Sequence, residues 1–161
     1  DLGDIIVNSM DLFLEMNLDK EYIGHVISVR EMLEPEIAKL AARNRTEEDL
    51  KCIANSIIKL EQCDPKNYVK EGEIDREFHM NIAKSSGNHL ILILLTPVFK
   101  LMPRIRSIVY KDLNYIKSDA IEHHQKISEM IRKQDENGAY KVMKEHLDIA
   151  KIHSEKILEY L

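Results

Sequence analysis

The sequence predicts an all-α protein, an antiparallel bundle of about six to seven helices. Apolar residues recur at helical spacing through almost the whole chain, and no segment shows the strict alternation of a β-strand. Five glycines and four prolines in 161 residues are too few for the tight turns of a sandwich or barrel. Short connections favour antiparallel neighbours. The length fits a single domain over residues 1–161.

Three helices are expected in the first part of the chain. Apolar side chains at helical spacing predict a first helix over about residues 3–16 and a long second helix over about 20–44. Pro35 falls inside the second helix, where it should cause a kink or remove one backbone hydrogen bond. Thr46, followed by three acidic residues, is typical of an N-cap and opens a third helix.

Two more helices flank the clearest break in the sequence. Asp64-Pro65 places a proline at the first position of a fourth helix, which runs to the segment Ser85-Ser86-Gly87-Asn88. That segment favours a turn. An apolar helix over about residues 89–110, interrupted by Pro97 and Pro103, should follow it.

The last part of the chain predicts a polar connector and two helices. The connector covers residues 111–117, and Ser118 caps a helix that ends near Gln134. Asn137-Gly138 predicts a turn, and the final helix should run to the C-terminus.

Charge and hydropathy argue against nucleic-acid binding by this chain and against a membrane-spanning segment. A net charge of −5 makes the chain by itself a poor binder of nucleic acid. The longest apolar run, Leu90–Leu95, is far too short to cross a membrane, and the first residues do not have the pattern of a signal peptide. Cys52 and Cys63 lie in one predicted helix, ~16 Å apart and beyond disulfide reach, and free thiols fit a cytoplasmic protein.

Histidines are the residues in this sequence that best suit a chemical site. Asp75 and His79 are four residues apart, so they share a helix face and can reach one point. His124 and His146 lie among apolar residues of two later helices. A carboxylate and imidazoles that converge inside a bundle would suit a divalent metal ion. A single histidine is more often a hydrogen-bonded, half-buried side chain, and helix phase alone does not choose between His123 and His124.

Six short motifs follow one another along the chain in the order of a known family. They are Val29–Pro35, Leu40–Ala42, Asp75–His79, Ser86–Asn88, Glu122–Ile127 and Ala139–Leu147. Each motif is weak alone. Together they resemble the C-terminal effector-binding (FCD) domain of GntR-type transcription regulators of the FadR subfamily, and the resemblance covers nearly the whole chain.

This resemblance implies a helical bundle with a single metal ion at its centre. Members of the metal-containing branch use one Asp and three His, and the first two of these ligands correspond to Asp75 and His79. Their last two histidines are typically 22 residues apart, a spacing that His124 and His146 match and His123 does not. The implied cofactor is one divalent ion per protomer, with Zn, Ni and Mn all suited to this set of ligands.

The family also implies that the chain is one part of a longer regulator. Its DNA-binding part is an N-terminal winged helix, which nothing in this chain resembles, and the chain does not begin with Met. We therefore expect an effector-binding and dimerisation domain, residues 1–161, of a homodimer that binds operator DNA through the missing domain. No membrane partner is expected.

A metal with three neutral imidazoles and one carboxylate keeps positive charge and an open position, so we expect a small organic acid as effector. Arg30 is the first candidate for a second carboxylate contact; the alternative is an Arg on the outer face of its helix. Asn88 could bind the effector or cap the following helix. Arg104 and Arg106 are weaker candidates, more simply explained as solvated surface charge. His153 could line the site, but a partly exposed side chain is the simpler interpretation.

Two other functions remain open from the sequence. A metal-dependent hydrolase or oxygenase could use the same Asp and His ligands, but it would need a general acid or base. Glu77 points away from the Asp75/His79 pair on a helix, and no other candidate stands out, so we do not expect an enzyme. A helical dimerisation domain whose histidines bind nothing is the third alternative.

Overall fold

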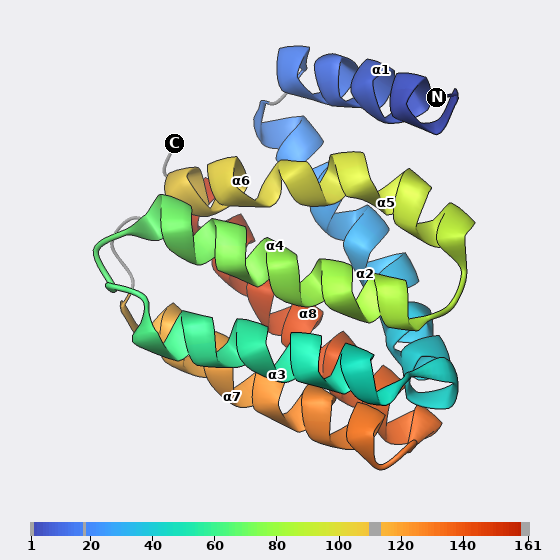
Figure 1. The fold of residues 1–161 in the computed structure, drawn as a ribbon. Helices are drawn as coiled ribbons and strands as arrows, with labels where there is room; N and C mark the ends of the chain where they lie inside the picture. Colours follow the sequence, from blue (N-terminus) through green and yellow to red (C-terminus); the bar gives the residue numbers. More distant parts are fainter. Residues whose placement is uncertain (1, 18, 110–113, 159–161) are drawn as a thin grey trace.

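The computed structural model describes residues 2–17, 19–109 and 114–158 (Figure 1). These residues form helices and short connections and contain no strand, so the predicted all-α antiparallel bundle is confirmed. The helices are α1 (Leu2–Met16), α2 (Lys20–Asn44), α3 (Glu47–Gln62), α4 (Tyr68–Ser85), α5 (His89–Lys100), α6 (Met102–Val109), α7 (Asn114–Arg132) and α8 (Glu136–Leu158).

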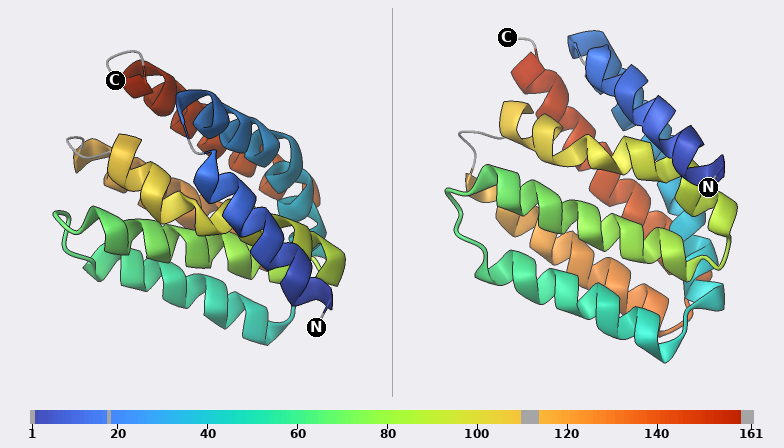
Figure 2. Two further views of the ribbon diagram at one scale, coloured as in Figure 1. Left: turned by 90° about the horizontal axis from the view of Figure 1, so that it is seen from above. Right: turned by 45° about the horizontal axis from the view of Figure 1, so that its top comes forward.

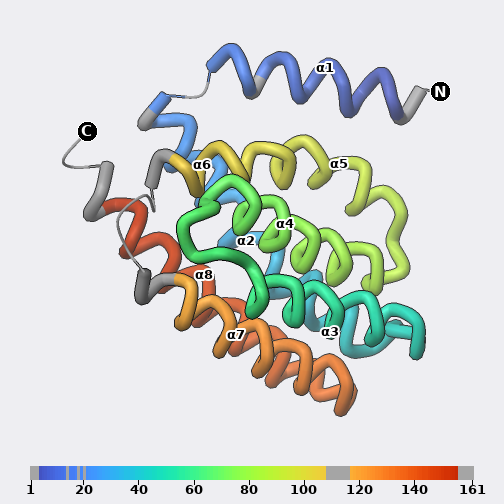
Figure 3. The backbone as a smooth tube through the Cα atoms, turned by 60° about the vertical axis from the view of Figure 1, so that its left-hand side comes forward, coloured from blue at the N-terminus to red at the C-terminus, as the bar shows by residue number. Residues whose placement is uncertain are grey.

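The bundle is built from two antiparallel helix pairs, which Figure 1 shows most clearly. One pair is α3 and α4, the other is α7 and α8, and the two pairs meet where α3 contacts α7. Helix α2 packs along α8 and also contacts α4 and α7, while α5 and α6 cover α4. Helix α1 lies across α5 at the edge of the bundle, as Figure 2 and Figure 3 also show.

Side-chain caps fix where several helices begin. Thr46 forms a capping box with Asp49, as its sequence context predicts. The fourth helix begins at Tyr68 rather than at Pro65, because the preceding segment forms a turn in which the Asn67 N–H donates to the Asp64 carbonyl at 2.9 Å. Asn67 then caps α4 by accepting a hydrogen bond from the Lys70 N–H at 3.1 Å.

The expected apolar helix over residues 89–110 is two helices, α5 and α6, with Leu101 between them. Pro103 explains the break, because it has no N–H to continue the hydrogen-bond ladder and fits the first turn of a new helix. Helix α5 continues through Pro97, and α2 continues through Pro35. Residue 110 lies outside the described residues.

Two expectations in the last part of the chain are wrong. Helix α7 begins at Asn114, so Ser118 is not its cap; residues 111–113 of the predicted connector lie outside the described residues. The turn before α8 is centred on Gln134, whose φ is 57°, and Asn137 and Gly138 belong to the first turn of α8. The described part of this helix ends at Leu158, and residues 159–161 lie outside it.

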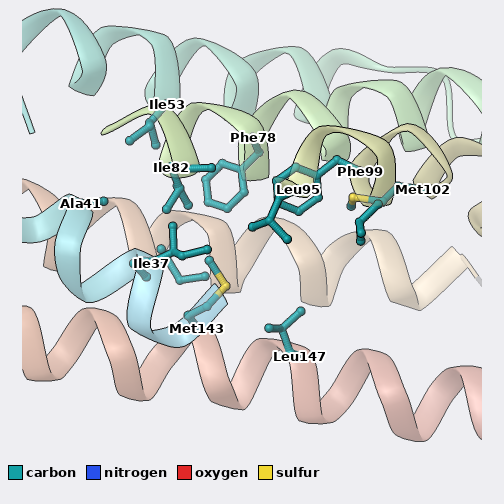
Figure 4. Close-up of a cluster of buried hydrophobic side chains, with 14 of the residues drawn as sticks. Ile37, Ala41, Ile53, Phe78, Ile82, Leu95, Phe99, Met102, Met143 and Leu147 are labelled. Atoms are coloured by element: carbon teal, nitrogen blue, oxygen red, sulfur yellow. The ribbon is translucent and has the colours of Figure 1, made fainter. Parts of the chain in front are cut away.

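The hydrophobic core is formed by side chains of α2, α3, α4, α5, α6, α7 and α8. Figure 4 shows part of it, including Phe78 and Ile82 of α4, Leu95 of α5 and Met143 of α8. Helix α6 approaches α4 very closely, since a Cβ placed on Gly72 would lie 2.5 Å from the Cα of Pro103. A glycine is required at this contact.

None of the described helices is both long and apolar enough to cross a membrane.

Candidate metal centre

Three buried histidines meet where α4, α7 and α8 pack together. His79 comes from α4, His124 from α7 and His146 from α8. The exposed fractions of these three residues are 1%, 0% and 8%, respectively. Each offers one ring nitrogen, and these three atoms all lie within 4.8 Å of one another. This is the separation expected of donors that face one common point.

Asp75 lies one turn before His79 on α4 and faces the same point. Its Oδ1 is 3.3 Å from His124 Nε2 and 4.0 Å from His79 Nε2. The structure therefore brings together the four residues that the sequence selected for a metal. It also separates the two neighbouring histidines of α7, because His123 is half-buried and its Nδ1 lies 2.8 Å from the Asp119 carbonyl.

Burial and the surrounding charges favour protonation states that suit metal binding. Burial lowers the pKa of His124 and of His146 well below 6.5, and neighbouring positive groups lower both further. Burial by itself raises the pKa of Asp75, but the charges of His79, Arg106 and Arg30 outweigh it and lower this pKa. Neutral imidazoles and an ionised carboxylate are the forms that act as metal ligands.

The surroundings of His124 fit a bound cation. Its ring stacks on Phe78, with a centroid distance of 3.7 Å and an interplanar angle of 12°. Both ring nitrogens are buried without a hydrogen-bond partner among the described residues. A buried polar atom without a partner destabilises the folded protein. A cation bound at Nε2 would give this nitrogen the partner that it lacks. Imidazole-rich donor sets suit Zn, Ni and related divalent ions.

Glu34 of α2 is a buried member of the site that the sequence analysis missed. It is 2% exposed, and its Oε2 lies 2.5 Å from His79 Nδ1. Arg30 Nε donates to its Oε1 at 2.5 Å. Burial alone raises the pKa of Glu34, but Arg30 and His79 lower it to about 2, so this carboxyl is ionised. One signal was available: Arg30 and Glu34 fall on the apolar face of α2 that also carries Ile23 and Ile37.

Arg30 points into the bundle and not outward. Its side chain is 13% exposed, and its NH2 group lies 3.2 Å from His79 Nε2. The alternative of an Arg on the outer face of the helix is therefore wrong. The expectation of solvated surface charge is wrong for Arg106, which is buried and pairs with Glu71 at 3.2 Å. Arg104 is exposed, as expected of surface charge.

A cavity of about 60 Å³, partly open to solvent, reaches this cluster. Asp75 and His146 lie in its wall, and so do Arg30, Arg106, His123 and His153. The remaining wall is mostly apolar and comes from α2, α6, α7 and α8. The cavity therefore combines cationic groups at the histidine cluster with an apolar lining.

Asn88 does not belong to this cavity. It is exposed at the N-cap of α5, where its Oδ1 accepts a hydrogen bond from the Leu90 N–H at 3.1 Å. It is not among the residues of the cavity wall. Its position supports the capping role and gives no support to the effector contact.

Comparison with known proteins places the chain in a family. A family model described as the FCD domain matches residues 25–149. The chain belongs to the FCD domain family. The resemblance inferred from the six sequence motifs is confirmed at this level, and the match includes every residue of the histidine cluster.

Two relatives of this FCD domain come from Bacillus subtilis (strain 168). The uncharacterized HTH-type transcriptional regulator YcbG is 29% identical over 135 residues, which are 83% of this chain and 54% of YcbG. The HTH-type transcriptional regulator LutR is 31% identical over 94 residues, which are 58% of this chain and 42% of LutR. The chain spans about half the length of these relatives. Both are named as transcriptional regulators.

Two solved structures share the fold. Streptococcus agalactiae GntR is 29% identical, with a TM-score of 0.65 over 80% of this chain and 57% of that one. E. coli McbR/YncC has a TM-score of 0.73 over 89% of this chain and 68% of that one, at 18% identity. The second likeness concerns the FCD fold alone.

Proposed function

We propose that this FCD domain senses a small organic carboxylate at a divalent metal ion held by Asp75, His79, His124 and His146. The observation that carries the proposal is the convergence of three buried imidazoles and one carboxylate beside a cavity. Zn, Ni and Mn are the candidate ions. When bound, the ion supplies positive charge and an open coordination position for an anionic ligand.

The chain's own residues add further contacts for a carboxylate. Arg30 reaches both the histidine cluster and the cavity, and a guanidinium can hold a carboxylate with two hydrogen bonds. Arg106 contributes a second guanidinium to the wall. Val26, Ile27 and Leu147 provide apolar wall that excludes water and strengthens these charged interactions.

We also propose that the domain works inside a longer, cytoplasmic, dimeric regulator. The matched segments cover only 54% and 42% of the relatives named as HTH-type regulators, which fits an additional N-terminal winged helix that binds operator DNA. Exposed apolar side chains on α1 and α5 suit a homodimer contact; they include Leu12, Phe13, Leu90 and Leu94.

Thermal unfolding with and without Zn²⁺ tests this proposal. Acetate and succinate should raise the melting temperature of the Zn²⁺-loaded protein, since a ligand at 100 times its Kd stabilises the native state by about 2.7 kcal/mol. Arg30→Met should abolish the shift. Arg104→Met, which removes an exposed Arg outside the cavity wall, is the matched control and should keep it. Absence of any shift, or an unchanged shift in Arg30→Met, would contradict the proposal.

A further inference from the structure

Arg30, Glu34 and His79 form a closed cluster that joins α2 to α4. Glu34 uses one carboxylate oxygen for each partner: Oε1 accepts from Arg30 Nε, and Oε2 lies 2.5 Å from His79 Nδ1. The second contact has the distance of an ion pair without the angles of a hydrogen bond. Arg30 closes the cluster by placing its NH2 group 3.2 Å from His79 Nε2.

The chemistry of these groups determines which ring nitrogen of His79 carries the proton. A guanidinium only donates hydrogen bonds, so a contact between Arg30 NH2 and His79 Nε2 requires a lone pair on Nε2. The proton of a neutral ring is then on Nδ1. An ionised carboxylate only accepts hydrogen bonds, so Glu34 Oε2 favours a proton on Nδ1 over a lone pair on that nitrogen.

This tautomer is the one that a metal ligand needs. Nε2 of His79 is the nitrogen that lies 4.0 Å from Asp75 Oδ1, on the side of the histidine cluster. A histidine that binds through Nε2 must keep its proton on Nδ1, and the ionised Glu34 carboxylate 2.5 Å from Nδ1 favours that choice. A bound ion would take the Nε2 lone pair that faces Arg30 NH2 here.

We propose that Glu34 is a positioning residue that holds His79 in the Nδ1–H tautomer and so prepares its Nε2 to bind the metal. This inference rests on the proposed function, because it assigns a role toward the same metal. It goes beyond the four ligands, since Glu34 comes from a helix that supplies none of them.

Replacing Glu34 with Gln changes the chemistry at Nδ1 with little change in shape. The amide oxygen can still accept from Arg30 Nε, and this leaves the amide NH2 group facing His79 Nδ1. An NH2 group donates, so it favours a lone pair on Nδ1 and a proton on Nε2. Because Arg30 NH2 still donates toward Nε2, the ring then faces a donor at each nitrogen, and Glu34→Gln should remove the preference for the Nδ1–H tautomer.

The first measurement is the tautomer of His79, read from the ¹⁵N shifts of its ring nitrogens in metal-free protein at neutral pH. The wild-type ring should carry its proton on Nδ1, and this tautomer should be less populated in Glu34→Gln. A wild-type ring with its proton on Nε2 would overturn the inference without any variant being made. This readout does not depend on whether the metal proposal is correct.

The second measurement is Zn²⁺ affinity by competition with a chromophoric chelator. Glu34→Gln should weaken binding about 10- to 100-fold, the usual effect of losing the partner of a histidine ligand. Glu31→Gln is the control, since Glu31 lies one turn away on α2, carries the same charge and pairs with Lys151 at 3.1 Å; its affinity should stay at the wild-type value. Tight Zn²⁺ binding by Glu34→Gln would refute only the inference about Glu34. Absence of Zn²⁺ binding by the wild type would refute the proposed function.

Discussion

Neighbouring histidines on α7 allow a sharp test of the site, because His124→Ala and His123→Ala remove the same side chain one residue apart. His124 is fully buried and its Nε2 faces Asp75 at 3.3 Å. His123 is half-buried, and its Nδ1 lies 2.8 Å from the carbonyl of Asp119. We expect the first substitution to remove a metal ligand and the second to leave the metal ligands intact.

The size of the expected effect follows from the number of ligands. A structural zinc site with four protein ligands binds with an apparent free energy of about 10–16 kcal/mol at pH 7. If the ligands contribute equally, each one is worth about 2.5–4 kcal/mol. Because 1.4 kcal/mol is a factor of ten, His124→Ala should raise the Kd for Zn²⁺ about 100- to 1,000-fold. His123→Ala should change it by less than about threefold.

The assay is titration of the metal-free proteins with Zn²⁺ in the presence of a competing chelator. Since His124 also packs on Phe78, circular dichroism should first establish that His124→Ala is folded. Asp75→Asn, which keeps the side-chain volume, provides a second variant of the same site and should weaken binding in the same direction. Equal affinities for the two histidine variants, or a greater loss in His123→Ala, would refute the reasoning.

Two predictions concern the bundle itself. Gly72→Ala should lower the free energy of unfolding by about 1–3 kcal/mol, because the new Cβ would lie 2.5 Å from Pro103 Cα. Gly24→Ala should raise the free energy of unfolding by about 0.5–1 kcal/mol, because no atom lies within 4 Å of the new Cβ. Urea denaturation measures both, and equal stability of the two variants would contradict the close approach of α4 and α6. Glu71→Ala should lower the same free energy by about 3–5 kcal/mol, since it removes the buried carboxylate that pairs with Arg106. Glu73→Ala, two residues away and paired with Lys70 at the surface, should have little effect; a small loss in Glu71→Ala would contradict the buried pair.

Hydrophobic periodicity was sufficient to predict most of the fold. The predicted helix over residues 20–44 agrees with α2, and Thr46 caps α3 as expected. The helix boundaries that were predicted wrongly depend on hydrogen-bonded turns that compete with the start of the helix. Asn67 is the cap of α4 although Pro65 is a favourable first residue, because the Asp64 carbonyl closes a turn before the helix begins.

The cluster of three histidines and Asp75 was predicted in part from spacing and in part from family resemblance. Asp75 and His79 share a helix face by their spacing alone. The choice of His124 over His123 needed the spacing to His146 that the family implies, because which side of α7 faces the core depends on packing. Glu34 was missed because a glutamate on a long helix is usually solvated, and its burial depends on His79, which is 45 residues away in the sequence.

The central claim is that His79, His124, His146 and Asp75 bind one divalent ion together. Anomalous X-ray diffraction from crystals of the Zn²⁺-loaded domain, recorded on both sides of the zinc edge, tests it most directly. The account predicts one anomalous peak per protomer, with one ring nitrogen of each histidine and one carboxylate oxygen of Asp75 at about 2.0–2.2 Å. A peak bound instead by His123 and His153, or no peak between α4, α7 and α8, would contradict it.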